Sequence, residues 1–123
     1  MKLLIIDDAD AVRPRLADAL GEIEGLDVSS CAPRAGGIIE RIRDSRPEVV
    51  VIDIGMLADA LDLVRSIKSA AHAPVVIALS SSSSIQYRAA CHNAGAEYFF
   101  DMDRDQARLL ESVTELQKEL AFR

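Results

Sequence analysis

Two uninterrupted apolar runs constrain the fold of this chain more than any other feature of its sequence. They occupy Leu3–Ile6 and Val49–Ile52, and each has the length of a strand that is buried on both faces. Strands of this kind occur in parallel sheets that helices cover above and below. The two runs therefore predict an α/β protein.

Helical and extended segments alternate along the rest of the chain. Apolar residues recur at helical spacing in residues 11–23, 35–43, 57–70, 85–94 and 106–120. Strands are expected at residues 3–6, 26–28, 48–52, 75–79 and 98–100. Successive βα units predict a doubly wound five-stranded parallel sheet with helices on both faces and right-handed crossovers. Because no linker or internal repeat interrupts the pattern, we expect one domain over residues 1–123.

Three carboxylates stand where the two apolar runs end. Asp7 and Asp8 follow the first run, and Asp53 follows the second. Ligands of an open α/β sheet bind beyond the carboxyl ends of its strands, so the three acids meet in one pocket if the two strands are neighbours. Carboxylates this close repel one another unless a cation joins them, and clustered hard oxygen ligands suit Mg²⁺. The pattern predicts a divalent ion beside a reactive aspartate.

Charge and hydropathy exclude several classes of protein. The chain has 14 basic and 20 acidic side chains and a net charge of -6, which argues against nucleic acid or an anionic membrane as the main partner. No apolar run approaches the roughly 20 residues that span a bilayer. The first residues do not resemble a signal peptide. We therefore expect a cytoplasmic protein.

The cysteines and histidines show no pattern of a metal or redox site. Cys31 and Cys91 lack both metal-ligand spacing and a CxxC arrangement, so each is expected to pack as a small apolar residue. His72 and His92 have no second ligand or base at useful spacing, which argues against a metal or phosphohistidine role.

A serine patch, residues 80–84, follows the fourth expected strand directly. Residues 81–84 are typical of a flexible loop. Ser80 differs, because it is the first residue beyond the apolar strand and lies at the same sheet edge as the aspartates. Its hydroxyl can donate a hydrogen bond to an anionic oxygen bound or developing on Asp53.

Taken together, these positions resemble the receiver domain of bacterial two-component response regulators. Acidic residues follow the first and third strands and a serine follows the fourth, and the resemblance covers essentially the whole chain. Gln86-Tyr87-Arg88, Cys91 and the stretch Gly95–Asp101 resemble a group of small stand-alone receivers. The resemblance implies a flavodoxin-like (βα)5 fold with strand order 2-1-3-4-5.

The resemblance also implies a role for each residue of the site. Asp53 is implied to be the phospho-acceptor, with Asp8 as the direct Mg²⁺ ligand and Asp7 as the acid that reaches the metal through water. The carbonyl of Gly55 is implied to be a backbone ligand of the metal. Phosphoryl transfer needs an in-line carboxylate and cations on the equatorial oxygens more than it needs covalent chemistry.

A switch and its partners follow from the same resemblance. Ser80 is implied to turn toward the phosphoryl group, and Phe99 to be the switch aromatic whose rotamer follows that hydroxyl. The phosphoryl donor is expected to be a phosphohistidine on a sensor histidine kinase or a phosphotransfer protein. The chain is then an acceptor that assists its own phosphorylation and dephosphorylation, not a turnover enzyme.

Two departures from the family pattern put part of this in doubt. The family usually places a lysine where this chain has Met102, and a thioether cannot supply the positive charge that pairs with the acceptor. The usual proline after the acceptor is replaced by Leu57, and the glycine that usually comes a few residues later is also missing. The site either remains phosphorylatable or belongs to a degenerate receiver that signals weakly through phosphate.

Two alternatives from other classes remain open. A pseudo-receiver would bind a partner regardless of phosphorylation, which Met102 favours and the retained aspartates oppose. A small haloacid-dehalogenase-type phosphatase would use the segment Asp8–Val12, which resembles the DxDxT/V motif, with Ser80 and Asp101 or Asp103 as later motifs. The chain lacks the cap and the lysine of such enzymes, and phosphate-monoester turnover with Asp8 modified would favour this class.

Finally, the fourth helix, fifth strand and fifth helix are expected to form an interaction surface. They carry Tyr87, Tyr98, Phe99 and an apolar face on residues 109–120, next to the expected switch. We expect docking of a downstream protein, or formation of a homodimer, on this surface. The alternative is that most of these residues fill the core.

Overall fold

A computed structural model of the chain describes residues 1–6, 12–31, 37–54, 59–80, 85–102 and 104–121. Strands and helices alternate throughout these residues. The strands are β1 (Lys2–Ile6), β2 (Asp27–Cys31), β3 (Val49–Asp53), β4 (Val75–Ser80) and β5 (Tyr98–Asp101). The helices are α1 (Val12–Gly21), α2 (Ile38–Ser45), α3 (Ala60–Lys68), α4 (Ile85–Ala94) and α5 (Gln106–Ala121).

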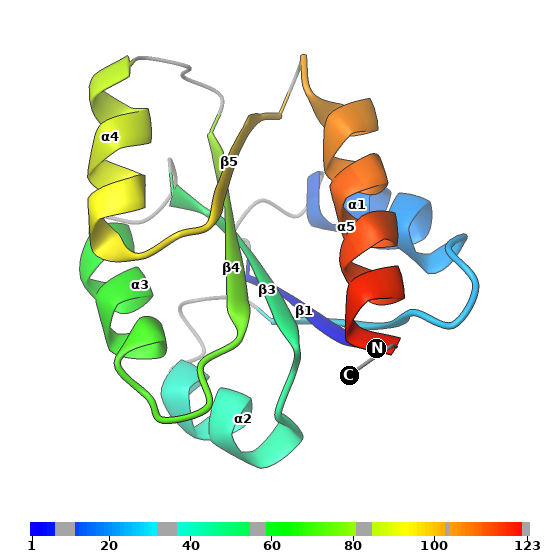
Figure 1. The fold of residues 1–123 in the computed structure, drawn as a ribbon, viewed down its shortest axis with the longest axis horizontal. Helices are drawn as coiled ribbons and strands as arrows, with labels where there is room; N and C mark the ends of the chain where they lie inside the picture. Colours follow the sequence, from blue (N-terminus) through cyan, green and yellow to red (C-terminus); the bar gives the residue numbers. More distant parts are fainter. Residues whose placement is uncertain (7–11, 32–36, 55–58, 81–84, 103, 122–123) are drawn as a thin grey trace.

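The strands form one parallel sheet in the order β2-β1-β3-β4-β5; β1, β3, β4 and β5 are labelled in Figure 1. This confirms the predicted fold class and strand order. The register pairs Ile6 with Ile52 and Ser80 with Asp101. The carboxyl ends of these four strands therefore lie at one edge of the sheet.

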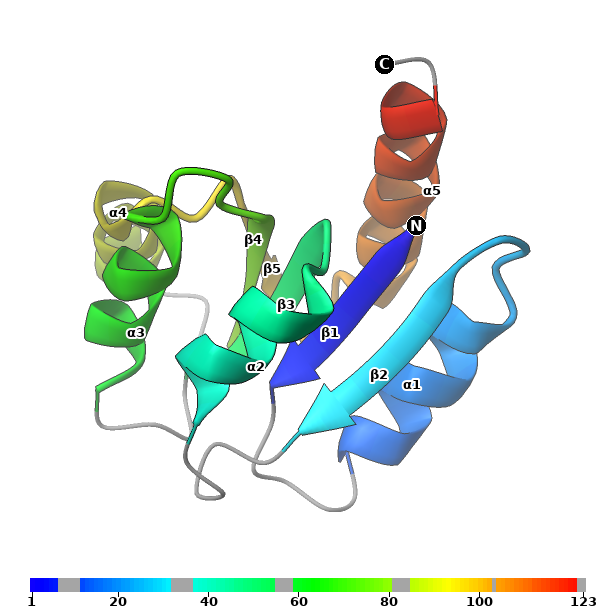
Figure 2. The same ribbon diagram turned by 90° about the horizontal axis from the view of Figure 1, so that it is seen from below.

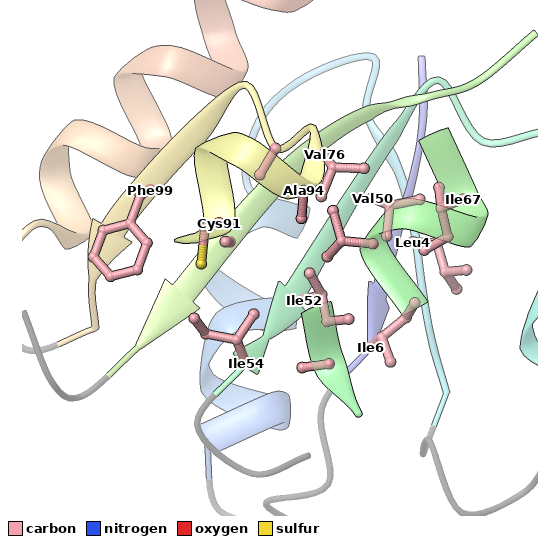
Figure 3. Close-up of a cluster of buried hydrophobic side chains, with 14 of the residues drawn as sticks. Leu4, Ile6, Val50, Ile52, Ile54, Ile67, Val76, Cys91, Ala94 and Phe99 are labelled. Atoms are coloured by element: carbon pink, nitrogen blue, oxygen red, sulfur yellow. The ribbon is translucent and has the colours of Figure 1, made fainter. Parts of the chain in front are cut away.

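Helices cover both faces of the sheet. Helices α1 and α5 lie on one side, and α2, α3 and α4 lie on the other (Figure 2). Side chains alternate between the two faces along each strand, so one apolar run supplies two cores. Leu4, Ile6, Val50 and Ile52 pack toward α3 and α4 (Figure 3), and Leu3, Ile5, Val49 and Val51 pack toward α1 and α5.

Some elements differ from their predicted bounds for identifiable reasons. The edge strand β2 extends to Cys31 because its polar residues still pair with β1 up to Ile6, which an apolar pattern does not reveal. Helix α2 begins at Ile38 because Gly37 is in the left-handed conformation, with φ of 67°, and a helix cannot pass through it.

Gly95 ends α4 as predicted, and it has two physical reasons to be glycine. Its φ is 113°, which an L-residue with a side chain adopts only under strain. A Cβ atom at this position would also lie 2.9 Å from Cγ of Lys68. The end of α4 therefore packs directly against α3.

Candidate functional site

The buried polar side chains of the described residues gather at one place in the fold. They are Asp53, Ser80 and Asp101, and each is at most 5% exposed. They are the last residues of β3, β4 and β5, which are neighbours in the sheet. Burial of polar groups costs free energy unless they are paired, and none of the three is without an interaction partner. Their concentration at one sheet edge indicates a functional site.

The register fixes how these residues are placed. Asp53 pairs with Leu79, the residue before Ser80, and Ser80 pairs with Asp101. The acceptor predicted from the sequence and the predicted hydroxyl therefore end adjacent strands, one register step apart. Contact between Ser80 and a group bound to Asp53 stays a prediction.

The remaining predicted metal ligands lie outside the described residues. These are Asp7, Asp8 and Gly55. Asp7 directly follows Ile6, whose register partner Ile52 directly precedes Asp53. No three His, Cys, Asp or Glu side chains gather as a metal site within the part of the chain that is described. Their role as metal ligands stays a prediction.

Hydrogen bonds fix Asp101, Met102, Arg104 and Asp105 where β5 ends and α5 is about to begin. The backbone N–H of Asp101 donates to Oδ2 of Asp105 at 3.0 Å, and the N–H of Arg104 donates to Oδ1 of Asp101 at 3.1 Å. The N–H of Asp105 donates to the carbonyl of Asp101 at 2.9 Å, and that of Met102 to the carbonyl of Ser80 at 3.0 Å. Position 102 is thereby held against the end of β4.

We expect Asp105→Ala to lower the free energy of unfolding by about 1–3 kcal/mol, because it leaves a part-buried backbone N–H without its charged acceptor. Asp105→Asn retains an acceptor oxygen and should cost less. Urea denaturation measures both. The matched control is Asp62→Ala on α3, where the carboxylate forms an exposed ion pair with Arg65 and the expected change is within about 0.5 kcal/mol. Equal losses at positions 105 and 62 would contradict this account.

The predicted switch aromatic Phe99 and the residue at the position of the family's usual lysine, Met102, are both packed against apolar cores. Phe99 is buried on the side of α3 and α4, where the guanidinium carbon of Arg88 lies 5.1 Å from its ring centroid. Met102 is partly buried and packs on the other side, against the core that includes Phe100 and Leu109.

Sequence comparison places this site in a known family. Residues 3–114 match the response regulator receiver domain. The chain belongs to this family. Protein-glutamate methylesterase/protein-glutamine glutaminase 5 of Myxococcus xanthus is 31% identical over 83 residues, which are 67% of this chain and 24% of that protein. The similarly named protein of Anaeromyxobacter dehalogenans is 33% identical over 81 residues, which are 65% of this chain and 22% of that protein. The chain thus matches only about a quarter of the length of these relatives.

Solved structures show the same fold. A LuxR-family two-component response regulator from Aurantimonas has a TM-score of 0.83 at 21% identity, covering 99% of this chain and 86% of that one. The response regulator domain of Thermotoga maritima CheB has a TM-score of 0.78 at 20% identity, covering 94% of both chains. The receiver assignment is confirmed and with it a place in two-component signalling, so the phosphatase alternative is wrong.

Outside the polar edge, most of the expected surface aromatics are packed. In this receiver Tyr87 is 44% exposed on α4. Tyr98 is partly buried and stacks on Phe100, with ring centroids 6.0 Å apart. A cleft of about 360 Å³ lies between α4 and β5, lined by Arg88, Ala89, His92, Ala96, Glu97, Tyr98 and Phe99. Fewer of these aromatic side chains are therefore exposed than the sequence indicates.

The cysteines pack as expected. Cys31 and Cys91 are both buried, and burial raises the pKa of the Cys91 thiol. A raised pKa keeps the thiol protonated, which makes it a poor nucleophile. His72 and His92 are exposed. No helix among the described residues combines the length and apolar character needed to cross a membrane.

Sequence reasoning missed the ion pair that joins α3 to Glu97, the residue before β5. Nζ of Lys68 lies 2.8 Å from a carboxylate oxygen of Glu97 and also donates to the carbonyl of Pro74 at 2.8 Å. The second carboxylate oxygen of Glu97 accepts the N–H of Val76 at 3.3 Å. Helical spacing places Lys68 on the inner side of α3, but only the assembled sheet brings its partners together.

Proposed function

We propose that this receiver accepts one phosphoryl group on Asp53 from a phosphohistidine of a sensor histidine kinase or phosphotransfer protein. The observation that carries the proposal is the concentration of buried polar side chains at the ends of β3, β4 and β5. Asp53 is the last residue of β3, and ligands of an open α/β sheet bind beyond the carboxyl ends of its strands.

The chain's own residues would perform the transfer. A carboxylate oxygen of Asp53 attacks phosphorus while the bond from phosphorus to the imidazole nitrogen of the donor breaks. The product is an acyl phosphate on Asp53 and a neutral imidazole after proton uptake. The hydroxyl of Ser80, one register step away, would then donate a hydrogen bond to a phosphoryl oxygen. Such a transfer depends on position and charge more than on acid–base catalysis.

The available donors fit a divalent cation of the Mg²⁺ type. Asp53 supplies a buried carboxylate, and the chain places Asp7 and Asp8 directly after the strand that pairs with β3. All three are hard oxygen donors, which Mg²⁺ prefers. With the carbonyl of Gly55, they would hold the ion, and the ion would neutralise charge on the transferred group.

Incubation with phosphoramidate and Mg²⁺, followed by intact mass spectrometry, tests the proposal. We expect the mass to rise by one phosphoryl group with Mg²⁺ and not in the presence of EDTA. An unchanged mass at saturating donor and Mg²⁺ would support the second candidate, a receiver that binds its partner without phosphate. The packing of Met102 where the family usually has a lysine is the observation that favours this candidate.

We also propose that α4, β5 and α5 form the interaction surface. They include Phe99 on β5, and Tyr87 is a large apolar side chain exposed on α4. In light scattering with beryllofluoride and Mg²⁺ as a phosphoryl mimic, we expect Tyr87→Ala to weaken self-association about tenfold, as removal of a central aromatic commonly does. Asp18→Ala, on the exposed side of α1, is the control. The reverse result would assign docking to α1.

A further inference from the structure

A surface arginine packs on a buried aromatic ring in this receiver. Arg88 is exposed on α4, yet its guanidinium carbon lies 5.1 Å from the ring centroid of Phe99. This distance is within the range of a cation–π interaction. Phe99 itself is 8% exposed and packs with Cys91 and Ala94 of the same helix (Figure 3). The Phe99 ring thus packs against the apolar core and also against the charged guanidinium of Arg88.

The neighbouring side chains do not draw the guanidinium of Arg88 away from the Phe99 ring. Glu97 lines the same cleft, but its carboxylate is engaged by Lys68 at 2.8 Å and by the N–H of Val76. Arg88 forms no ion pair with any residue that the structure describes. An acidic neighbour that could draw the arginine away from Phe99 is therefore already neutralised.

Phe99 also lies on the same face of the sheet as the predicted hydroxyl. Its register partner is Ala78, two residues before Ser80. Because side chains alternate along a strand, Ala78, Ser80 and Phe99 all belong to the face that α4 covers. A movement of Ser80 toward a phosphoryl group would open space on the side where the ring lies.

We propose that Arg88 is a positioning residue that holds Phe99 in its buried position before any phosphoryl group is present on Asp53. The inference rests on the proposed function and on the expectation from the sequence that the rotamer of Phe99 follows the Ser80 hydroxyl. A ring that is already held inward responds little to phosphorylation, since a ligand shifts an equilibrium only by its differential affinity for the two states. The cleft between α4 and β5, which both residues line, is then formed in the unphosphorylated protein.

Nuclear magnetic resonance on protein with ring-¹³C phenylalanine tests this inference. The chain has three phenylalanines, and Phe99→Leu identifies the resonance of Phe99. Broadening by a neutral paramagnetic agent reports the exposure of the ring. We expect Arg88→Gln to raise the exposed population of Phe99 about two- to fivefold, as the loss of an exposed cation–π contact implies. Arg88→Lys, which keeps a cation, should give a smaller rise.

The control is Arg65→Gln, which removes the same charge from the exposed side of α3, where Arg65 contacts Asp62. It should leave the Phe99 resonance unchanged. Far-ultraviolet circular dichroism confirms that each variant is folded, and Arg88→Lys serves if Arg88→Gln is not. Beryllofluoride with Mg²⁺ should restore protection of the ring in Arg88→Gln and change the wild type little.

The possible results distinguish the role of Arg88 from the proposed phosphoryl switch. A Phe99 resonance that is the same in Arg88→Gln and wild type, or that moves equally in Arg65→Gln, overturns the role of Arg88. If Arg88→Gln frees the ring but beryllofluoride alters it in no variant, Arg88 still positions Phe99 and the proposed phosphoryl switch is wrong.

Discussion

Asp53→Asn is expected to abolish phosphoryl transfer from phosphoramidate to the protein. The amide is nearly isosteric with the carboxylate, so packing at the end of β3 should change little, but it is not a nucleophile toward phosphorus and cannot hold Mg²⁺ as an anion. Intact mass spectrometry at saturating donor should show one phosphoryl group on the wild type and none on the variant.

Two further variants test whether the effect is specific to Asp53 and whether it depends on a metal ligand. Asp62→Asn makes the same change on the exposed side of α3 and should be phosphorylated like the wild type. Asp8→Ala leaves the acceptor in place but removes a predicted metal ligand, so the rate should fall and the residual reaction should require more Mg²⁺. Stoichiometric phosphorylation of Asp53→Asn would show that another side chain is the acceptor.

The sequence predicts this fold well because its central strands are buried on both faces. Four consecutive apolar residues in β1 and in β3 leave few alternatives to a covered parallel sheet. The edge strand β2 was harder to delimit, since its backbone pairs on one side only and its residues can be polar. Helix α2 was placed too early because periodicity does not report the left-handed conformation of Gly37.

The candidate site, like the fold, could be predicted from the sequence only in part. Its polar residues can be predicted because each one ends a strand, and strand ends meet by topology alone. The contacts that support the site cannot be predicted so easily. The bond between Asp101 and Asp105 depends on how the chain turns into α5, and the contact of Arg88 with Phe99 depends on how α4 packs on β5. Such contacts follow from tertiary structure rather than from local pattern.

Position 102 lies on the same side of the sheet as the predicted acceptor. Met102 belongs to the same core as Val51 and Leu79, and alternation along β3 places Asp53 on that side of the sheet too. The N–H of Met102 is fixed to the carbonyl of Ser80. A longer cationic side chain at 102 would therefore start on the acceptor's side of the sheet and keep its stem on apolar surface while its charged end reaches out.

Met102→Lys is accordingly expected to raise the melting temperature without metal and to shrink the increase that Mg²⁺ produces. In the wild type a cation from solution is expected to relieve the repulsion among Asp7, Asp8 and Asp53, and a ligand at a hundred times its Kd stabilises by about 2.7 kcal/mol. A built-in ammonium would supply part of that relief beforehand. For the melting temperature to rise, the stability gained from this relief must exceed the stability lost with the thioether packing, which is about 1 kcal/mol. Differential scanning calorimetry with and without Mg²⁺ measures both effects.

The same substitution should speed phosphorylation by about tenfold or more, because one preorganised charge at a transition state commonly contributes more than this. Met102→Leu is the matched control: it keeps an apolar side chain of similar volume, adds no charge, and should change neither the rate nor the Mg²⁺ increment. If Met102→Lys behaves like Met102→Leu in both measurements, position 102 does not reach the acceptor pocket. The lysine position of the family pattern would then lie elsewhere in this chain.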